Sequence, residues 1–180
     1  MAPAKYHWIS AWFAITAPII LWDAGYLLMR PRSMEGGDLR WIWSFFDIYE
    51  RIDNVYSIKG YYEKAGFGPA AAVLNIIETT LNLLYLYFVH VAPNDMAPIF
   101  GFSGAGLTLA KTTLWALQEH FCQHCSYAAG MTNFTEFFKF WIAPTVVWYI
   151  FCSSIVVTLG TDMASALSGR TESMLQHKTK

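Results

Sequence analysis

Four long apolar stretches constrain this chain more than any other feature of its sequence. They run over about His7–Met29, Gly68–Val91, Ile99–Phe121 and Phe140–Gly160. Each is close to the roughly 20 residues that an α-helix needs to cross a hydrocarbon core. Only helices suit such stretches, because lipid offers no partners to free backbone N–H and C=O groups. We therefore predict an all-α integral membrane protein built as a four-helix bundle.

The composition supports this prediction. Of the 180 residues, 55% are apolar and only 14% are charged, whereas about 25% are charged in an ordinary soluble domain. The net charge of −1 gives no basic surface for nucleic acid. A phosphate-binding loop, a dinucleotide glycine fingerprint and a nucleophile elbow are all missing from the sequence. We therefore expect neither a nucleic-acid partner nor a nucleotide cofactor.

The links between the apolar stretches differ in length. The first, Ser33–Phe67, is long and alternates aromatic with charged residues, which predicts one or two short amphipathic helices on the membrane face. The links around Ala92–Pro98 and Cys125–Thr135 are short, which favours antiparallel neighbouring helices. We predict one transmembrane domain over residues 1–165 and a polar, weakly ordered tail over residues 166–180.

A dense group of histidines and cysteines lies after the third apolar stretch: His120, Cys122, His124 and Cys125. Zinc sites use these residue types. The group stands at a predicted helix end and has no second pair elsewhere, so we set aside both a metal site and a redox pair, and we expect no metal and no cofactor. Three glycines, Gly101, Gly104 and Gly106, are interpreted as positions of close helix packing.

Ionisable residues within the apolar stretches are the strongest functional signal. A charge in a bilayer is expensive to bury and is therefore a functional candidate by default. Asp23, Glu78 and Glu119 occur in the first three stretches, and Lys111 precedes Glu119 by about two turns. Lys111 and Glu119 could equally be structural, through pairing or by reaching the interface. Glu78 has no short route to water from mid-membrane, which favours a functional role.

Polar and aromatic side chains share helical faces with these charges. They are Asn75 and Asn82 beside Glu78, Trp115 between Lys111 and Glu119, and Thr145 with Trp148 in the fourth stretch. The alternative interpretation is ordinary packing and helix–helix hydrogen bonding. If these faces converge, they enclose an apolar pocket that contains carboxyl groups and indole rings.

Such a pocket suits proton-transfer chemistry on a lipid. A carboxylic acid kept neutral by apolar surroundings can protonate an alkene, and a second carboxylate can then remove a proton from the next carbon. Indole faces would stabilise the cation formed between the two steps. This chemistry requires no nucleophile, metal or organic cofactor. The same pocket would also bind lipophilic amines, because their ammonium group mimics the cation.

Several short motifs resemble those of the EXPERA family, which holds sterol isomerases and the sigma-2 receptor. They are Trp22–Tyr26, Tyr49–Asp53 with Tyr56, Asn75–Leu84, Leu114–His120 and Thr145–Trp148. The resemblance covers about residues 10–160. It implies a multi-pass protein of the endoplasmic reticulum, a sterol-like or terpenoid lipid substrate, and a homodimer.

Three positions depart from the family's isomerase. Asp23 is a shorter acid where the isomerase has a glutamate. Ile19 stands where the isomerase has a histidine, and Thr145 stands where it has an asparagine. These differences favour a lipid other than a sterol, such as a terpenoid or polyketide-derived compound of fungal secondary metabolism.

Together these features predict a membrane isomerase that shifts a double bond through a carbocation. The predicted catalytic residues are Asp23 and Glu78, with Glu119 as a further candidate. The predicted substrate-binding residues are Asn75, Asn82, Trp115, Thr145, Trp148 and Tyr56. Two alternatives stay open: an acid-initiated cyclase with the same residues, and a non-catalytic protein that binds sterols or lipophilic amines.

Overall fold

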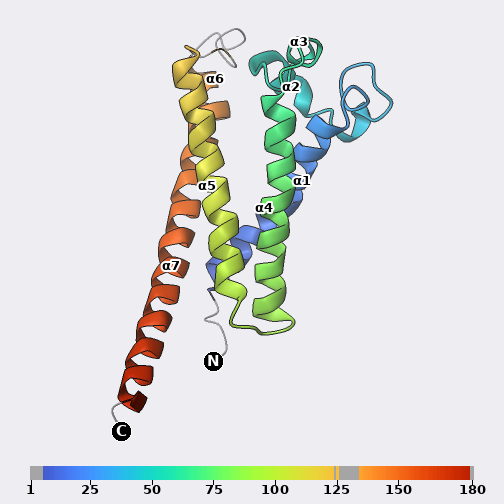
Figure 1. The fold of residues 1–180 in the computed structure, drawn as a ribbon. Helices are drawn as coiled ribbons and strands as arrows, with labels where there is room; N and C mark the ends of the chain where they lie inside the picture. Colours follow the sequence, from blue (N-terminus) through green and yellow to red (C-terminus); the bar gives the residue numbers. More distant parts are fainter. Residues whose placement is uncertain (1–5, 124, 126–133, 179–180) are drawn as a thin grey trace.

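Four long helices carry the fold in the computed structural model, which describes residues 6–123, 125 and 134–178, with side chains described up to Gly169 (Figure 1). The long helices are α1 (His7–Leu28), α4 (Phe67–His90), α5 (Ala97–Phe121) and α7 (Ala143–Lys178). The short ones are η1 (Arg40–Ile42), α2 (Phe46–Ile52), α3 (Ile58–Tyr62), α6 (Phe134–Phe137) and the π-helical segment η2 (Phe138–Ile142). All regular structure in these residues is helical, so the all-α prediction is confirmed.

The long helices pack in chain order. α4 packs against both α1 and α5, and α5 packs against α7. The short link between α4 and α5 makes them antiparallel neighbours, as predicted (Figure 1). Trp12 of α1 stacks on Phe151 of α7 with 4.0 Å between ring centroids, so the first and last helices also meet.

Three segments are long and apolar enough to cross a membrane: His7–Leu28, Phe67–His90 and Phe134–Gly169. The predicted four-span bundle is therefore not confirmed, because α5 is not among them. The polar residues of α5 explain its lower apolar character. Glu119 is only 1% exposed, and Lys111 forms an ion pair within the bundle. Apart from His120, the exposed side chains of α5 are apolar, among them Ile99, Leu107, Leu114, Leu117 and Phe121.

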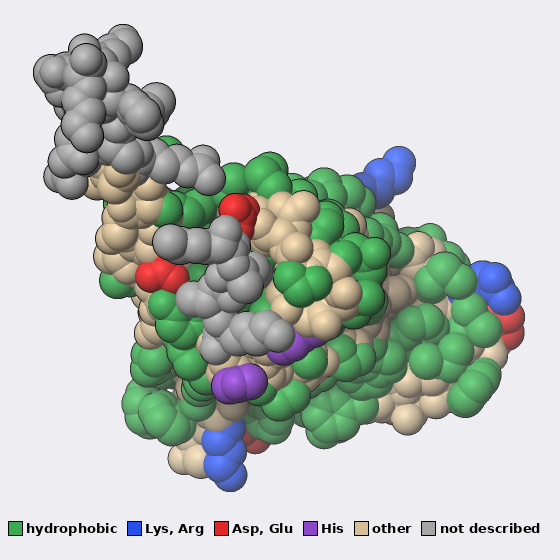
Figure 2. All heavy atoms as spheres, turned by 90° about the horizontal axis from the view of Figure 1, so that it is seen from below, with side chains coloured by type: hydrophobic (Ala, Val, Ile, Leu, Met, Phe, Trp, Pro, Cys, Tyr) green, Lys and Arg blue, Asp and Glu red, His purple; other side chains and the backbone are tan. Residues whose placement is uncertain are grey.

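Large apolar side chains are exposed over much of the outside of the bundle. Figure 2 shows the molecule from the end that holds the α4–α5 link, and hydrophobic side chains cover most of the described surface there, with few charges. Exposed large hydrophobic residues occur along every long helix, including Ile15, Val73, Leu114 and Ile150. Large exposed apolar surfaces mark contact with a partner or a lipid, and three helices of membrane length favour lipid.

The predicted amphipathic link forms a cap on one end of the bundle. It contains η1, α2 and α3, in agreement with the short helices that its pattern predicts. Reciprocal indole bonds fasten it to α1: Trp43 Nε1 donates to the carbonyl of Trp22 at 2.8 Å, and Trp22 Nε1 donates to the carbonyl of Ile42 at 3.1 Å. The cap is therefore fixed to the helix that carries Asp23.

Glycines bring α4 and α5 close together. A Cβ on Gly104 would collide with the side-chain oxygen of Asn82, and one on Gly101 would lie 2.7 Å from the ring of Tyr85. The packing interpretation is confirmed for these two. It is wrong for Gly106, where an added Cβ would meet nothing within 4 Å.

The last helix continues further than the sequence predicts. The polar segment from residue 166 was expected to be a weakly ordered tail, but α7 runs on as one helix to Lys178. Figure 1 shows this helix extending past the end of the other three. The polar residues of this segment are compatible with a helix, since no proline or run of glycines interrupts it.

Candidate functional site

A cavity of about 370 Å³ lies beneath the cap, between all four long helices. This volume is within the range of about 300–1,000 Å³ that is usual for small-molecule sites. Six of the nine predicted site residues line it: Asp23, Tyr56, Asn75, Trp115, Thr145 and Trp148. The other three predicted residues, Glu78, Asn82 and Glu119, do not line it.

Helical spacing explains how distant residues reach one chamber. Lys111 and Trp115 are four residues apart on α5, so they lie on the same face and both line the cavity. Trp141, Thr145 and Trp148 are likewise spaced by about one turn on η2 and α7, and all three line it. Each helix thus presents one inward face to the same space.

Asp23 is held by two neutral donors. The hydroxyl of Tyr56 donates to Oδ1 at 2.9 Å, and the side-chain amide of Asn75 donates to Oδ2 at 3.3 Å. Burial and the charge of Asp23 raise the pKa of Tyr56 well above its usual range, so this phenol keeps its proton and remains a donor. Donors on both oxygens suit the carboxylate form of Asp23.

A second carboxyl group in the cavity was missed from the sequence. Asp53 lies just after α2, is 7% exposed and lines the cavity. Burial raises its pKa to about 7, and the nearby carboxylates of Glu119 and Asp23 add to the effect. Its Oδ1 accepts a hydrogen bond from the backbone N–H of Val55 at 2.8 Å. Asp53 is therefore partly protonated near neutral pH and is able to donate a proton.

The aromatic residues on either side of Asp53 were a sequence signal for a cavity position, but the alternation of charged and aromatic residues in this segment obscured it. Asp53 stands among aromatic residues, between Tyr49 and Tyr56, and both of these also line the cavity. Because the segment alternates charged and aromatic residues, its pattern predicts amphipathic helices on the membrane face and does not single out Asp53. A chain that folds back over its own bundle places some of those charges inside.

Glu78 belongs to the same polar network but lies behind the cavity wall. It is 1% exposed, and its Oε2 accepts hydrogen bonds from Lys111 Nζ at 2.7 Å and from Thr108 Oγ1 at 2.9 Å. Lys111 also donates to the side-chain oxygen of Asn75, which in turn holds Asp23. The two carboxyl groups predicted to act as a pair are thus connected through Asn75 and Lys111, and Lys111 neutralises Glu78.

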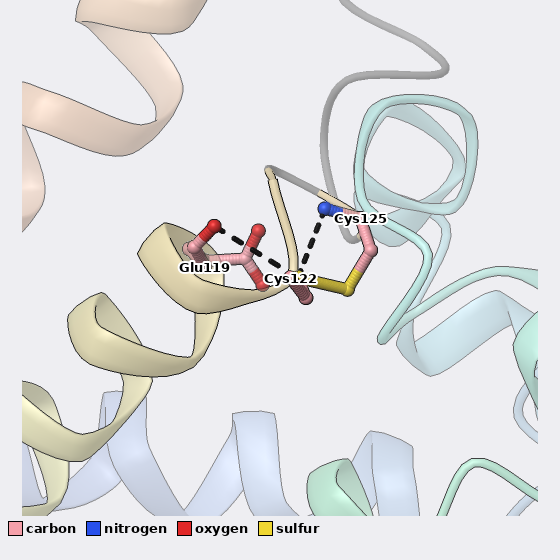
Figure 3. A group of neighbouring side chains, drawn as sticks. All are labelled: Glu119, Cys122 and Cys125. Atoms are coloured by element: carbon pink, nitrogen blue, oxygen red, sulfur yellow. Dashed lines mark hydrogen bonds between the residues drawn. A yellow bond between two sulfur atoms is a disulfide. The ribbon is translucent and has the colours of Figure 1, made fainter.

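The other two predicted residues lie elsewhere. Asn82 lies at the contact of α4 with Gly104 of α5, which agrees with the alternative of helix packing. Glu119 lies at the end of α5 beside a disulfide between Cys122 and Cys125 (Figure 3). Both therefore occupy positions outside the cavity lining.

The cysteine group proves to be a bonded pair. Cys122 Sγ accepts a hydrogen bond from the backbone N–H of Cys125 at 3.1 Å (Figure 3). The atoms of Glu119, Cys122 and Cys125 that could bind a metal, a carboxylate oxygen and two sulfurs, lie within 4.8 Å of one another. A metal would need both sulfurs as thiolates, which the disulfide does not provide. Of the other two members of the group, His120 is exposed, and His124 lies outside the described residues. Cys152 is a free, buried cysteine.

Indole rings form much of the remaining wall. Trp22, Trp115, Trp141 and Trp148 all line the cavity. Trp115 packs edge-on against Phe67 at 5.6 Å between centroids, and Trp148 packs edge-on against Trp12 at 5.1 Å. These contacts hold rings in place around the carboxyl groups. The site therefore combines two carboxyl groups that have different hydrogen-bond partners with several electron-rich aromatic faces.

Comparisons with known proteins identify no relative. The chain matches no protein-family model, and neither a curated protein nor a solved structure is detectably similar to it. The resemblance of the short motifs to the EXPERA family therefore stays a prediction.

Proposed function

We propose that this protein is a membrane isomerase that moves a carbon–carbon double bond in a lipid by adding and removing a proton. The observation that carries the proposal is the pair Asp53 and Asp23 in one aromatic cavity. Burial raises the pKa of Asp53 to about 7, whereas Asp23 accepts hydrogen bonds on both oxygens. Two carboxyl groups in contrasting environments are typical of an acid and a base.

The proton steps balance without any other reactant. The carboxyl group of Asp53 gives its proton to one alkene carbon, which leaves a carboxylate and a carbocation. Asp23 then removes a proton from the neighbouring carbon, and the electrons of that C–H bond form the new double bond. Asp23 loses its proton to solvent, and Asp53 regains one. The double bond of the substrate changes position, and the elemental composition of the substrate stays the same.

This assignment replaces one member of the predicted pair. Glu78 was expected to act with Asp23, but Lys111 holds its carboxylate outside the cavity lining. Asp53 lines the cavity and is partly protonated near neutral pH. The proposed acid is therefore Asp53, and Glu78 serves to hold Lys111.

The tryptophans supply the stabilisation that the intermediate requires. A cation over an aromatic face gains about 0.5–2 kcal/mol, the more when water is excluded. Trp115 and Trp148 were predicted for this role and both line the cavity, together with Trp22 and Trp141. Several rings acting together would lower the barrier by a few kcal/mol.

The setting of the enzyme is part of the proposal. We propose that α5 is a fourth span, since its 25 residues match its neighbours and its charged side chains point into the bundle. The resemblance to the EXPERA family supports a location in the endoplasmic reticulum, a sterol-like or terpenoid substrate, and a homodimer.

The test uses hydrogen isotope from solvent. Membranes containing the protein are incubated in deuterated buffer with sterol and terpenoid alkenes, and the lipids are analysed by mass spectrometry. A proton-transfer isomerase introduces deuterium at the alkene carbon. Asp53→Asn should abolish incorporation, and Glu63→Gln, on the exposed cap surface, should not alter it. The rate should fall as the pH rises above about 7, since Asp53 then loses its proton.

Other outcomes identify the two alternatives. Deuterated products with an additional ring and one double bond fewer would indicate an acid-initiated cyclase with the same residues. Binding of sterols or lipophilic amines without any deuterium uptake would indicate a binding protein, and would contradict the isomerase. The amine-binding alternative draws on the same geometry, because the Asp23 carboxylate lies among indole rings.

A further inference from the structure

Two hydrogen-bond donors on one face of α5 have no role in the proposed proton transfer. Lys111 and Trp115 both line the cavity, one turn apart. The ammonium of Lys111 has three N–H donors, and two of its partners are Glu78 and Asn75. The indole N–H of Trp115 is buried and bonds to no residue that the structure describes. A buried donor without an acceptor is unfavourable, so this wall is suited to a ligand that supplies one.

The surrounding charges restrict the kind of acceptor. Lys111 lies 2.7 Å from the carboxylate of Glu78, so the pair brings no net positive charge to the wall. Asp23 and Asp53 line the same cavity and would repel an anion. An oxygen of a carboxylate or phosphate is thus disfavoured, and a neutral oxygen is favoured.

We infer that the ligand of this cavity is an apolar lipid with a neutral oxygen acceptor, a ketone or a hydroxyl group, bound by Lys111 and Trp115. The aromatic walls contact the hydrocarbon body. The oxygen fixes one end of the lipid at α5, and this orients the rest of the molecule relative to Asp23 and Asp53. The inference deepens the proposed function and rests on it for the role of this lipid as substrate, but the binding preference itself is independent of turnover.

The test compares two probes that differ by one oxygen. Androstanone and androstane share one rigid apolar skeleton, and only the first carries a ketone. Their affinities for the purified full chain in detergent are measured by quenching of tryptophan fluorescence. We expect androstanone to bind about tenfold more tightly or better, which corresponds to about 1.4 kcal/mol. A steroid carboxylate of the same skeleton should bind more weakly than the ketone.

Variants assign the preference to the two donors. Trp115→Phe keeps an aromatic ring and removes the N–H, and it should lower the ketone-to-hydrocarbon affinity ratio about threefold to tenfold. The paired change Glu78→Gln with Lys111→Met removes the ammonium without leaving a lone buried charge, and it should lower the ratio similarly. The matched controls are Trp41→Phe, at an exposed tryptophan, and Lys59→Met with Glu63→Gln, at an exposed ion pair.

The outcomes separate this inference from the proposed function. Equal affinity of the two probes for the unaltered chain, or a ratio unchanged in both variants, would overturn the inference. If the paired variant does not fold, the conservative Trp115→Phe change still decides. A preferred carboxylate would overturn the neutral-oxygen part. A chain that prefers the ketone but takes up no deuterium from solvent would keep the inference and contradict the isomerase.

Discussion

Replacing Asp53 by asparagine should make the protein more stable at alkaline pH while removing its activity. An ordinary aspartate has a pKa of 3.8, and burial raises that of Asp53 to about 7 in the folded chain. The folded state therefore holds the proton more tightly than the unfolded state does. Stability is lost as the pH rises from the unfolded pKa to the folded pKa, because the unfolded chain ionises first.

The size of this loss follows from the two pKa values. Each unit of difference corresponds to about 1.4 kcal/mol, so ionising Asp53 costs the folded state about 4 kcal/mol between pH 4 and pH 8. Asparagine cannot ionise, and its side-chain oxygen can still accept the hydrogen bond that Val55 donates. The variant should therefore lack this part of the pH dependence.

The assay is denaturant unfolding in mild detergent, followed by far-ultraviolet circular dichroism at several pH values. The difference in unfolding free energy between variant and unaltered protein should grow by about 4 kcal/mol from pH 4 to pH 8. The Glu63→Gln variant, at an exposed carboxylate, controls for the loss of one charge. Parallel pH curves for Asp53→Asn and the unaltered protein would refute the argument, because they would mean that Asp53 is not buried as an acid.

Three further predictions concern packing, charge pairing and the orientation of the base. Gly104→Ala should destabilise the chain by about 1–3 kcal/mol, because its Cβ collides with a side chain of α4. Gly106→Ala meets open space and should be neutral or stabilising in the same denaturant unfolding assay. Glu78→Gln and Lys111→Met should each cost about 3–5 kcal/mol, and the double variant should cost clearly less than their sum. A double-mutant cycle measures this difference, and simple additivity would show that the two side chains do not interact. Tyr56→Phe removes a hydrogen bond to a carboxylate worth about 1.5–3 kcal/mol, so solvent deuterium uptake should slow roughly tenfold or more, and an unchanged rate would exclude this role.

Helical periodicity explains why six residues predicted from separate segments line one cavity. A charged or aromatic residue in an apolar helix has to avoid lipid, so it faces inward, and inward faces at one depth meet. Asp23, Asn75, Trp115, Thr145 and Trp148 follow this rule. The same rule placed Glu78 in the interior correctly, but periodicity contains no information on which partner inside the bundle neutralises it.

The remainder depended on features without periodicity. Asp53 enters the cavity because the link folds over the bundle, and the direction of such a fold is set by tertiary contacts such as those between Trp22 and Trp43. Glu119 occupies a separate place because α5 ends beside the disulfide. The first error arises just after the end of α2 and the second in the last turn of α5, where residue spacing gives less information on direction.

The fastening of the cap has a consequence for how a lipid gains access. Tyr56 belongs to the cap and holds Asp23, and its backbone carbonyl accepts a hydrogen bond from Tyr26 of α1. Lifting the cap would therefore break the hydrogen bond from Tyr56 to Asp23 just as the lipid enters. A lateral opening between two helices, reached from the hydrocarbon core of the bilayer, would leave the hydrogen bonds of Asp23 intact. It would also let a lipid enter without passing through water.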